Sequence, residues 1–483
     1  MAAAVLIFLI ALDTTPIADD YGEFAGIMHA GTFQYLHSYW VGITDRYSNA
    51  ALMVVLVKLF GTAAIHIAAP LLLALLLWFC VVAARAAGMT SQSRFQGIVA
   101  SGLVAITIAV AAPDIFDASG WFNSVTIYLA GLVATAGTAA WIAHLAARRR
   151  PATSREAVAS FFIGLIAAGF TELAGIVIAL GSLLALANLR ELSPRGPRRR
   201  ALEIACAAIA AGAAIGVIVI FVGPGTRLRA HLQHGSLDPA VIANALRGAL
   251  GWAQTNAGWR VLLSVAVGVV VLHLRGQPRG RRSLRWLVIW ALFLCCVPMV
   301  TVGVTTGYSG LTLATSRTAW VATASIAMGE ALVAYVIAAA IVAAKPMLAR
   351  VAVPTAAVAV AVALLAFQAD ARSVIRAERL RRTAFAARAM SIRRQLRNGR
   401  RSVAVAPLPL IDPNVDAYDL RFGTRLQFVF VLDGIRAYYR IPRDVRIHVI
   451  ETQPLNYCLP HVRVGAFGVK PCSELAPGRR ARS

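Results

Sequence analysis

Long apolar runs decide what this chain can fold into. The longest is Ala50–Ala84, 35 residues that are almost all apolar or small. Lys58 and His66 are its only basic residues. A helix needs about 20 apolar residues to cross a bilayer, so this run is long enough for one crossing with residues to spare. Only 14% of the chain is charged, against about a quarter in soluble domains. We therefore expect an all-α polytopic membrane protein.

Hydropathy predicts eleven crossings. The run 50–84 is interrupted by Gly61, His66 and Pro70, which allows either two crossings or an interfacial helix, Asn49–Phe60, followed by one crossing. The charge pattern of the loops favours the second interpretation. The predicted spans are Met1–Ala18, Ala63–Ala84, Gln96–Ala112, Asn123–Ala147, Ala157–Phe170, Leu173–Leu189, Ala201–Val222, Gly258–Leu274, Trp286–Val302, Thr318–Ala344 and Val351–Phe367.

Arginine sets the expected orientation. Short loops rich in Lys and Arg stay on the cytoplasmic side of a membrane. The turns at 148–150, 195–200, 275–285 and 345–350 are of this kind, and they alternate with turns that are not. We therefore expect the amino terminus inside and the tail outside.

The domain boundaries follow the change in composition. We expect a transmembrane domain at 1–368, with a first outer loop at 17–62 that carries interfacial helices, and a soluble part at 369–483. The soluble part begins with a basic amphipathic helix, Ala371–Arg397. Its predicted apolar face would lie along the headgroups and consists of Ile375, Leu380, Phe385, Ile392 and Leu396. Strands are expected at Ser402–Leu410, Leu426–Leu432 and Asp444–Glu451, giving a small C-terminal α/β domain outside the cytoplasm.

Two further features bear on compartment and partners. Cys458 and Cys472 lie in the tail and could form a disulfide in an oxidising compartment. The net charge of +25 does not indicate nucleic-acid binding, because its arginines lie between apolar spans, where they set topology and contact anionic lipid.

The first outer loop holds the strongest candidates for chemistry. Asp19 and Asp20 follow the first span directly, and Tyr21 and Glu23 come next. Acids at the edge of a membrane are costly unless they face water, a cation or a reacting ligand. A solvated connecting loop is the alternative interpretation of this stretch.

Other polar residues are expected on the same side of the membrane. Asp114 follows the span 96–112, and Glu172 is the only acid of the run 157–189, at its outer turn. Arginines there are expected to bind phosphate, because a guanidinium pairs with it bidentately. These are Arg227, Arg229 and Arg317.

Each of these residues also has a structural interpretation. Glu172 could cap the helix that follows it, and Arg227 and Arg229 could contact headgroups. Asp45 and Arg46 favour a structural ion pair over a catalytic role. The pattern contains no metal-ligand set, although one of the paired acids could bind a divalent cation.

Several short motifs resemble those of the GT-C class of membrane glycosyltransferases, and more narrowly an uncharacterised bacterial multi-pass branch of it. The acid pair Asp19-Asp20 after the first span is one, and the interfacial run NAALMVVLVKLFG (49–61) is another. YWVGITDRYSN (39–49) resembles a loop pattern in which glycine is usual where Asp45 stands. GPGTRLR (223–229), Glu172, Arg317-Thr318 and NGRRSVAVAPLPL (398–410) also have counterparts there.

The resemblance implies a function. Such an enzyme moves a sugar from a polyprenyl-phosphate donor to a hydroxyl of a glycan or glycolipid acceptor, on the outer face of the bacterial cytoplasmic membrane, with inversion. It implies that Asp19 or Asp20 is the catalytic base. Glu172, Arg227, Arg229, Arg317, Tyr21 and Asp114 would then bind substrate.

Two other classes compete with this expectation. A transporter or flippase of a lipid-linked or anionic envelope substrate would place its ionisable groups near the midplane and show repeats. Here the acids gather at one edge and no fixed-period repeat occurs. A non-enzymatic scaffold that displays its tail would have no use for the acids of the first loop.

Overall fold

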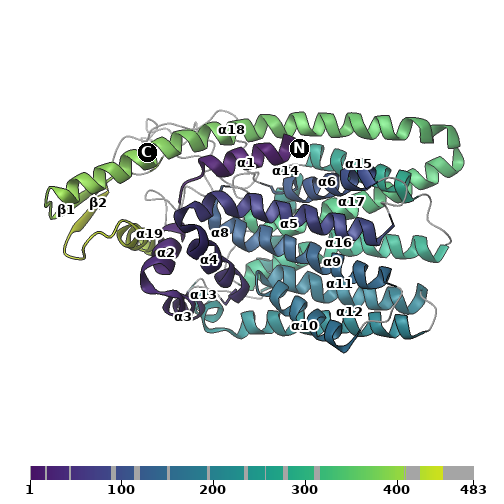
Figure 1. Ribbon diagram of the computed structural model, residues 1–483, viewed down its shortest axis with the longest axis horizontal. Coiled ribbons are helices and arrows are strands. Elements are labelled where there is room, and N and C mark those ends of the chain that lie inside the picture. The colour runs from purple at the N-terminus through teal and green to yellow at the C-terminus, as the bar shows by residue number, and fades with distance from the viewer. Residues whose placement is uncertain are drawn as a thin grey trace.

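The computed structural model describes a helical membrane protein with a small mixed region near the end of the chain (Figure 1). The described residues are 2–16, 19–42, 45–88, 94–113, 120–148, 153–192, 196–232, 238–255, 257–275, 281–308, 316–406, 408 and 425–449. The predicted disulfide between Cys458 and Cys472 lies outside them, as do Asp114 and the strand residues 409–410 and 450–451.

Helices account for nearly all the described elements. In the first quarter of the chain they are α1 (Ala2–Asp13), α2 (Asp19–Ala25), the π-helix η1 (Gly26–Ala30), α3 (Thr32–Gly42), α4 (Tyr47–Phe60), the 3-10 turn η2 (Gly61–Ala63), α5 (Ala64–Ala86) and α6 (Arg94–Val110). Next come α8 (Phe122–Ser124), the π-helix η3 (Val125–Leu129), α9 (Ala130–Ala147), α10 (Ser154–Ala168), α11 (Glu172–Leu192) and α12 (Pro197–Val222). The remaining elements are α13 (Pro224–Leu232), α14 (Pro239–Thr255), α15 (Ala257–Arg275), α16 (Arg281–Tyr308), α17 (Ser316–Ala344), η4 (Pro346–Leu348), α18 (Ala349–Arg397), β1 (Ser402–Val405), α19 (Arg425–Tyr438) and β2 (Arg446–Val449).

Eight helices among the described residues are long and apolar enough to cross a membrane. A helix occupies the place of each of the eleven predicted spans, but α1, α6 and α10 have only 12, 17 and 15 residues. The polytopic, all-helical class is thereby confirmed, while the number eleven stays a prediction.

The predicted break after the interfacial helix is present. The run divides into α4 and α5 at Gly61, whose φ of 59° lies in the left-handed region that glycine adopts without strain. Val55 and Leu59 on α4 are exposed, which gives α4 an apolar face that no other described part of the protein covers.

Glycines allow the closest helix contacts. A Cβ on Gly164 of α10 would clash with the backbone of Ile209 in α12, and one on Gly212 of α12 would clash with the backbone of Phe161 in α10. Without a hydrophobic driving force between helices in lipid, such close backbone packing is what holds spans together.

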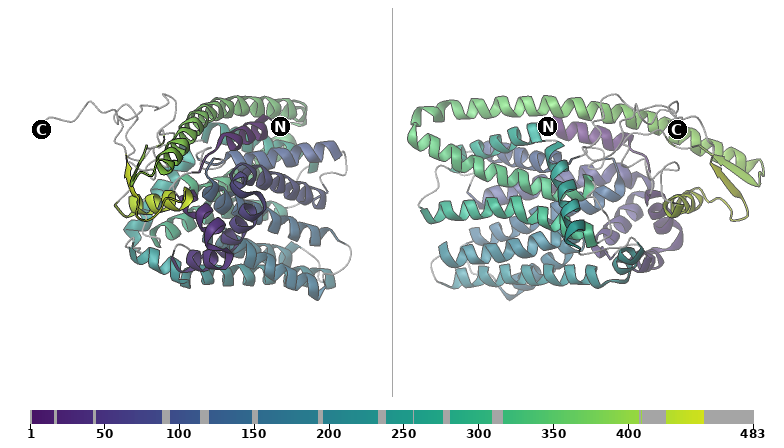
Figure 2. Two further views of the ribbon diagram at one scale, coloured as in Figure 1. Left: turned by 60° about the vertical axis from the view of Figure 1, so that its left-hand side comes forward. Right: turned by 180° about the vertical axis from the view of Figure 1, so that it is seen from behind.

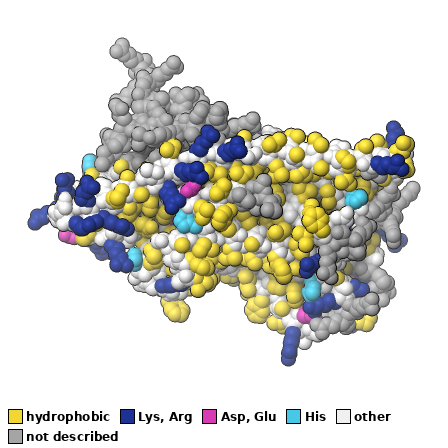
Figure 3. Space-filling view, turned by 45° about the horizontal axis from the view of Figure 1, so that its top comes forward, with side chains coloured by type: hydrophobic (Ala, Val, Ile, Leu, Met, Phe, Trp, Pro, Cys, Tyr) yellow, Lys and Arg dark blue, Asp and Glu magenta, His cyan; other side chains and the backbone are white. Residues whose placement is uncertain are grey.

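The two ends of the bundle differ in character. At one end lie α2, α3, α4, α13 and α19 (left in Figure 1); we call it the first-loop end. Described arginines gather at the opposite end: Arg198 of α12 donates to the Ala146 C=O at the end of α9, and Arg285 of α16 pairs with Glu191 at the end of α11. The far end of α10, by contrast, contacts the first loop through Ser48. In Figure 3 a broad band of hydrophobic side chains separates the clusters of Lys and Arg.

The helix α18 corrects the expected layout of the tail. It is one helix of 49 residues, it passes the predicted boundary at 368 without a break, and it projects beyond the bundle instead of turning across its end (Figures 1 and 2). Leu380, expected on the apolar face, is exposed, whereas Arg381 and Arg388 are buried.

The tail contains a β-α-β unit. The strands β1 and β2 pair in parallel, Ser402 opposite Arg446 and Val405 opposite Val449. The predicted strand Leu426–Leu432 is wrong, because these residues belong to α19. Parallel neighbours need a long crossover, usually a helix, and α19 provides it.

Candidate functional site

The acid pair of the first loop begins α2. Asp19 is the first residue of that helix, and its side chain lies outside the described part of the structure. The Asp20 side chain is fully buried, and its Oδ1 accepts a hydrogen bond from the Asn123 backbone N–H at 3.2 Å. Asn123 lies in the first turn of the helical run Phe122–Ala147. The positive end of that helix dipole stabilises the negative charge of Asp20.

A tyrosine of α3 binds the next acid of α2, and a second tyrosine of α3 binds α4. The Tyr35 hydroxyl donates a hydrogen bond to Oε2 of buried Glu23. Burial first, and then the Glu23 carboxylate, raise the pKa of Tyr35 well above its usual value of 10. Asn49 Nδ2 donates to the Tyr39 hydroxyl at 2.7 Å, which joins α3 to α4. Tyr35 therefore stays protonated and holds Glu23 in place.

Arg46 and Glu172 form a bidentate ion pair between the first loop and α11. Arg46 Nε lies 3.0 Å from Glu172 Oε2, and Nη2 lies 2.9 Å from Oε1. Burial lowers the pKa of Arg46, but the Glu172 carboxylate outweighs it and the pKa ends above its usual value. The guanidinium also lies 5.9 Å from the Tyr128 ring centroid. Both Glu172 oxygens are thus engaged by protein.

Asp45 anchors the turn that begins α13. Its carboxylate accepts hydrogen bonds from the backbone N–H groups of Gly225, at 3.3 Å, and Thr226, at 2.6 Å. A Cβ on Gly223 would overlap this carboxyl group, so glycine is required for the approach. The expected Asp45–Arg46 ion pair is wrong, because Asp45 binds the start of α13 and Arg46 pairs with Glu172 at the start of α11. Both contacts hold the first loop to a helix start.

The first loop and the tail share an aromatic cluster. Tyr21 packs with Phe385 of α18 and with Tyr438 and Tyr439, at ring-centroid distances of 5.4 to 6.5 Å. Arg388 donates to the Tyr21 hydroxyl and lies 5.4 Å from its ring centroid. Tyr21 is therefore a fully buried docking residue for the tail.

The cluster also lies within electrostatic range of Asp20. Burial and then Tyr439 raise the pKa of Tyr438 to about 12, and the Asp20 carboxylate adds to the rise while Arg393 and Arg388 oppose it. The tail thus lies against the predicted catalytic acid. Sequence reasoning missed this contact, although a signal was present: residues 378, 381, 385, 388 and 392 repeat at helical spacing and share the buried face of α18.

The structure brings together part of the predicted site. Asp20, Tyr21, Glu172 and the start of α13 all lie at the first-loop end, and Asn123 and Tyr128 connect the acid pair to Arg46 within two turns of one helical run. Arg227 is exposed on α13. The side chains of Arg229 and Arg317 lie outside the described part. Among the described residues, no group of three or more metal-ligating side chains gathers.

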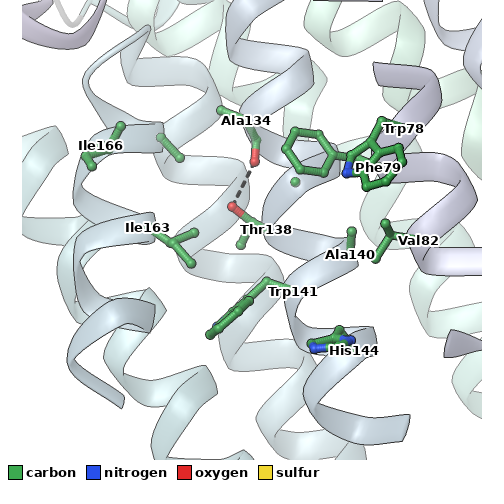
Figure 4. Close-up of a pocket in the computed structure, with 12 residues that line it drawn as sticks. Trp78, Phe79, Val82, Ala134, Thr138, Ala140, Trp141, His144, Ile163 and Ile166 are labelled. Atoms are coloured by element: carbon green, nitrogen blue, oxygen red, sulfur yellow. Dashed lines mark hydrogen bonds between the residues drawn. The ribbon is translucent and has the colours of Figure 1, made fainter. Parts of the chain in front are cut away.

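An apolar cavity opens between α5, α9 and α10, away from the acids (Figure 4). Its volume is about 370 Å³, and Trp78, Phe79, Trp141 and Ile163 line it. His144 lies at one end of it, beside Arg148 and the arginine-rich turn, with Arg148 Nε 3.0 Å from His144 Nε2. The lining suits a hydrocarbon chain.

Comparison with known proteins identifies no relative: the chain matches no protein family, no curated protein and no solved structure.

Proposed function

We propose that this chain is a membrane glycosyltransferase. In the proposal it moves a sugar from a polyprenyl-phosphate donor to a hydroxyl of a glycan or glycolipid acceptor, on the outer face of a bacterial cytoplasmic membrane. The proposal includes eleven crossings, a cytoplasmic amino terminus and an extracytoplasmic α/β tail. The observation that carries it is the burial of Asp20 against a helix N-terminus, at the start of the same helical run that ends near Arg148.

The chemistry requires one base and one phosphate site. The acceptor oxygen bonds to the anomeric carbon from the face opposite the leaving group, while the bond from that carbon to the phosphate oxygen breaks. The acceptor proton passes to a carboxylate within about 3 Å, that of Asp19 or Asp20. The leaving phosphate takes the bonding electrons, and Arg227, Arg229 and Arg317 share its charge.

Other predicted residues have supporting roles in this proposal. Glu172 is bound to Arg46, so it orients that guanidinium near the substrate. Tyr21 positions the tail over α2. Asp114 remains a candidate for contact with the sugar hydroxyls. A divalent cation, if required, would bind to whichever aspartate of the pair is not the base.

The test is transfer of label from a polyprenyl-phosphate sugar in membranes that contain purified variants. Positioned general-base catalysis contributes about 10²–10⁴-fold, so the Asp19→Asn, Asp20→Asn double variant should lose at least 100-fold. Asn still accepts the hydrogen bond from Asn123, so folding should be retained. Asp13→Asn, which affects the contact with Arg379 and Arg382, is the matched control. A double variant as active as the parent would overturn the proposal.

One observation favours a flippase as second candidate. Residues of α9 from Ala134 to His144 line the apolar cavity. They lie roughly 15–30 Å along the helical run from Asn123, which contacts Asp20. A lipid-linked substrate could load there from the leaflet near the arginine-rich turns, with its phosphate at Arg148. Movement of a fluorescent polyprenyl phosphate across vesicles, lost in Gly137→Leu and kept in the Asp19/Asp20 variant, would support this function over sugar transfer.

A further inference from the structure

An arginine with a strained backbone, Arg440, lies two residues after the end of α19. Arg440 has a φ of 53°, and it is the only non-glycine residue with positive φ among those described. Ile441 N–H bonds to Arg436 C=O at 2.9 Å, and Arg440 N–H bonds to Ala437 C=O at 3.3 Å. These are the two bonds of a Schellman motif, in which the left-handed position is usually glycine. A long side chain at a strained backbone position where glycine is usual indicates that the side chain itself has a function.

The Arg440 side chain lies against a histidine of the first loop. Its Nη2 is 3.2 Å from His29 Nδ1, and its Nε is 3.4 Å from His29 Nε2. Within the described residues no carboxylate lies at ion-pair distance from Arg440. The buried arginines Arg46 and Arg260, by contrast, each have a glutamate partner. Among the residues that the structure describes, Arg440 is therefore a positive charge that a histidine, and not an acid, holds in place.

Both side chains line a cavity of about 790 Å³ between α2, η1, α3 and α19. Its polar lining comes from His29, Gln34 and Arg440, and Gly22 and Gly26 leave backbone open to it. None of the described residues that line it is an acid. α2 and α19 lie at the first-loop end of the bundle (Figure 1), and we therefore place this cavity on the water side of the bilayer.

We infer that this cavity binds the anionic group, phosphate or carboxylate, of a water-soluble ligand such as a sugar phosphate or an acidic glycan. Arg440 pairs with two of its oxygens, His29 and Gln34 donate to it, and the glycines allow the attached group to approach. The inference goes beyond the proposed sugar transfer, since it concerns a separate cavity and is tested by binding alone.

The experiment titrates glucose 1-phosphate, with glucose as the neutral counterpart, against the full chain in phosphatidylcholine nanodiscs by calorimetry. Arg440→Gly is the decisive variant, because glycine suits the left-handed position and the turn is retained. We expect at least tenfold weaker binding of glucose 1-phosphate. His29→Asn should weaken binding severalfold. Arg443→Ala, an exposed arginine three residues later, should bind as the parent does.

The other outcomes overturn the inference. They are equal affinity for glucose and glucose 1-phosphate, absence of phosphate binding by the parent, or an Arg440→Gly variant with parental affinity. Nanodiscs that contain phosphatidylglycerol separate the two sources of phosphate. If that lipid competes with glucose 1-phosphate in the parent and not in Arg440→Gly, the site binds headgroups and the assignment to a water-soluble ligand is wrong.

Discussion

At the scale of single residues, the acids of the first-loop end owe their burial to helix starts. Asp20 binds the start of the run at Phe122, Asp45 binds the start of α13, and Glu172 lies in the first turn of α11 and pairs with Arg46. A buried carboxylate needs such donors, since isolated charge is costly away from water. These contacts fix the first loop onto three helices at once.

The ion pair of Arg46 gives a prediction at this scale. Glu172→Gln leaves the guanidinium buried without its counter-charge, and loss of one partner of a buried pair costs about 3–5 kcal/mol. Because both side chains keep slight exposure, 10% and 13%, we expect a loss of about 2–3 kcal/mol in thermal or denaturant unfolding in detergent.

Arg285→Ala is the matched control. The Arg285–Glu191 pair is also Arg–Glu, but its arginine is 59% exposed, so its loss should have little effect on unfolding. Equal losses in the two variants would contradict the role given to Arg46 and Glu172.

The sequence predicted the place of Glu172 but not its partner. Its position at the middle of an apolar run located it at an outer turn, because a chain of that length must reverse there. Arg46 lies 126 residues earlier, and a single sequence carries no signal that relates two such residues. Asp45, next to Arg46 in the sequence, was the obvious ion-pair partner for that arginine. In the tertiary structure Asp45 instead binds the start of α13, and Arg46 pairs with Glu172.

At the scale of elements, the tail shows how local patterns mislead. The stretch LQFVFVL has the aromatic and β-branched residues typical of a strand, yet it forms the first half of α19. The parallel pairing of β1 with β2 decides the outcome, since it requires a crossover that packs on the sheet and on α2. The break at Gly61, by contrast, was predicted correctly, because it depends on a local glycine conformation.

The contact between α19 and α2 yields a prediction. A Cβ on Gly434 would lie 3.1 Å from Gly22 N and 3.2 Å from Tyr21 Cβ, so Gly434→Leu should separate the two helices. We expect faster trypsin cleavage at Arg436 and Arg443 in the variant. Asp433→Leu, at the neighbouring exposed position, should be cleaved like the parent. Slow cleavage of both variants would mean that α19 does not depend on this contact.

At the scale of the whole molecule, hydropathy and arginine content predicted the architecture well. A helix lies at each predicted span, and contacts of the described arginines Arg198 and Arg285 join the end of α9 to the start of α12 and the end of α11 to the start of α16. Which helices touch could not be predicted, because every span is apolar on most faces and close approach depends on a few glycines such as Gly164 and Gly212.

The orientation of the bundle is the prediction at this scale. Reporter fusions after Arg150, Arg200 and Arg282 should report cytoplasm, and one after Gln368 should report the exterior, because the arginine-rich turns stay inside. A fusion after Gly42, in the predicted first outer loop, should also report the exterior, which serves as an internal check on parity. A cytoplasmic reporter after Gln368 would contradict the topology and place the first-loop end on the wrong side for the proposed acceptor.

Because α18 is unbroken, the rotation of its membrane part about the helix axis also sets the direction of the side chains in the tail. At 1.5 Å per residue its 49 residues extend about 73 Å from the turn at Lys345 to the tail. One residue inserted near Gln368 would turn Phe385 and Arg388 by about 100° away from Tyr21. Seven would restore their direction to within about 20° but lift the tail by about 10 Å. The number of residues in α18, and not its sequence alone, therefore determines whether the tail meets the acids of the first loop.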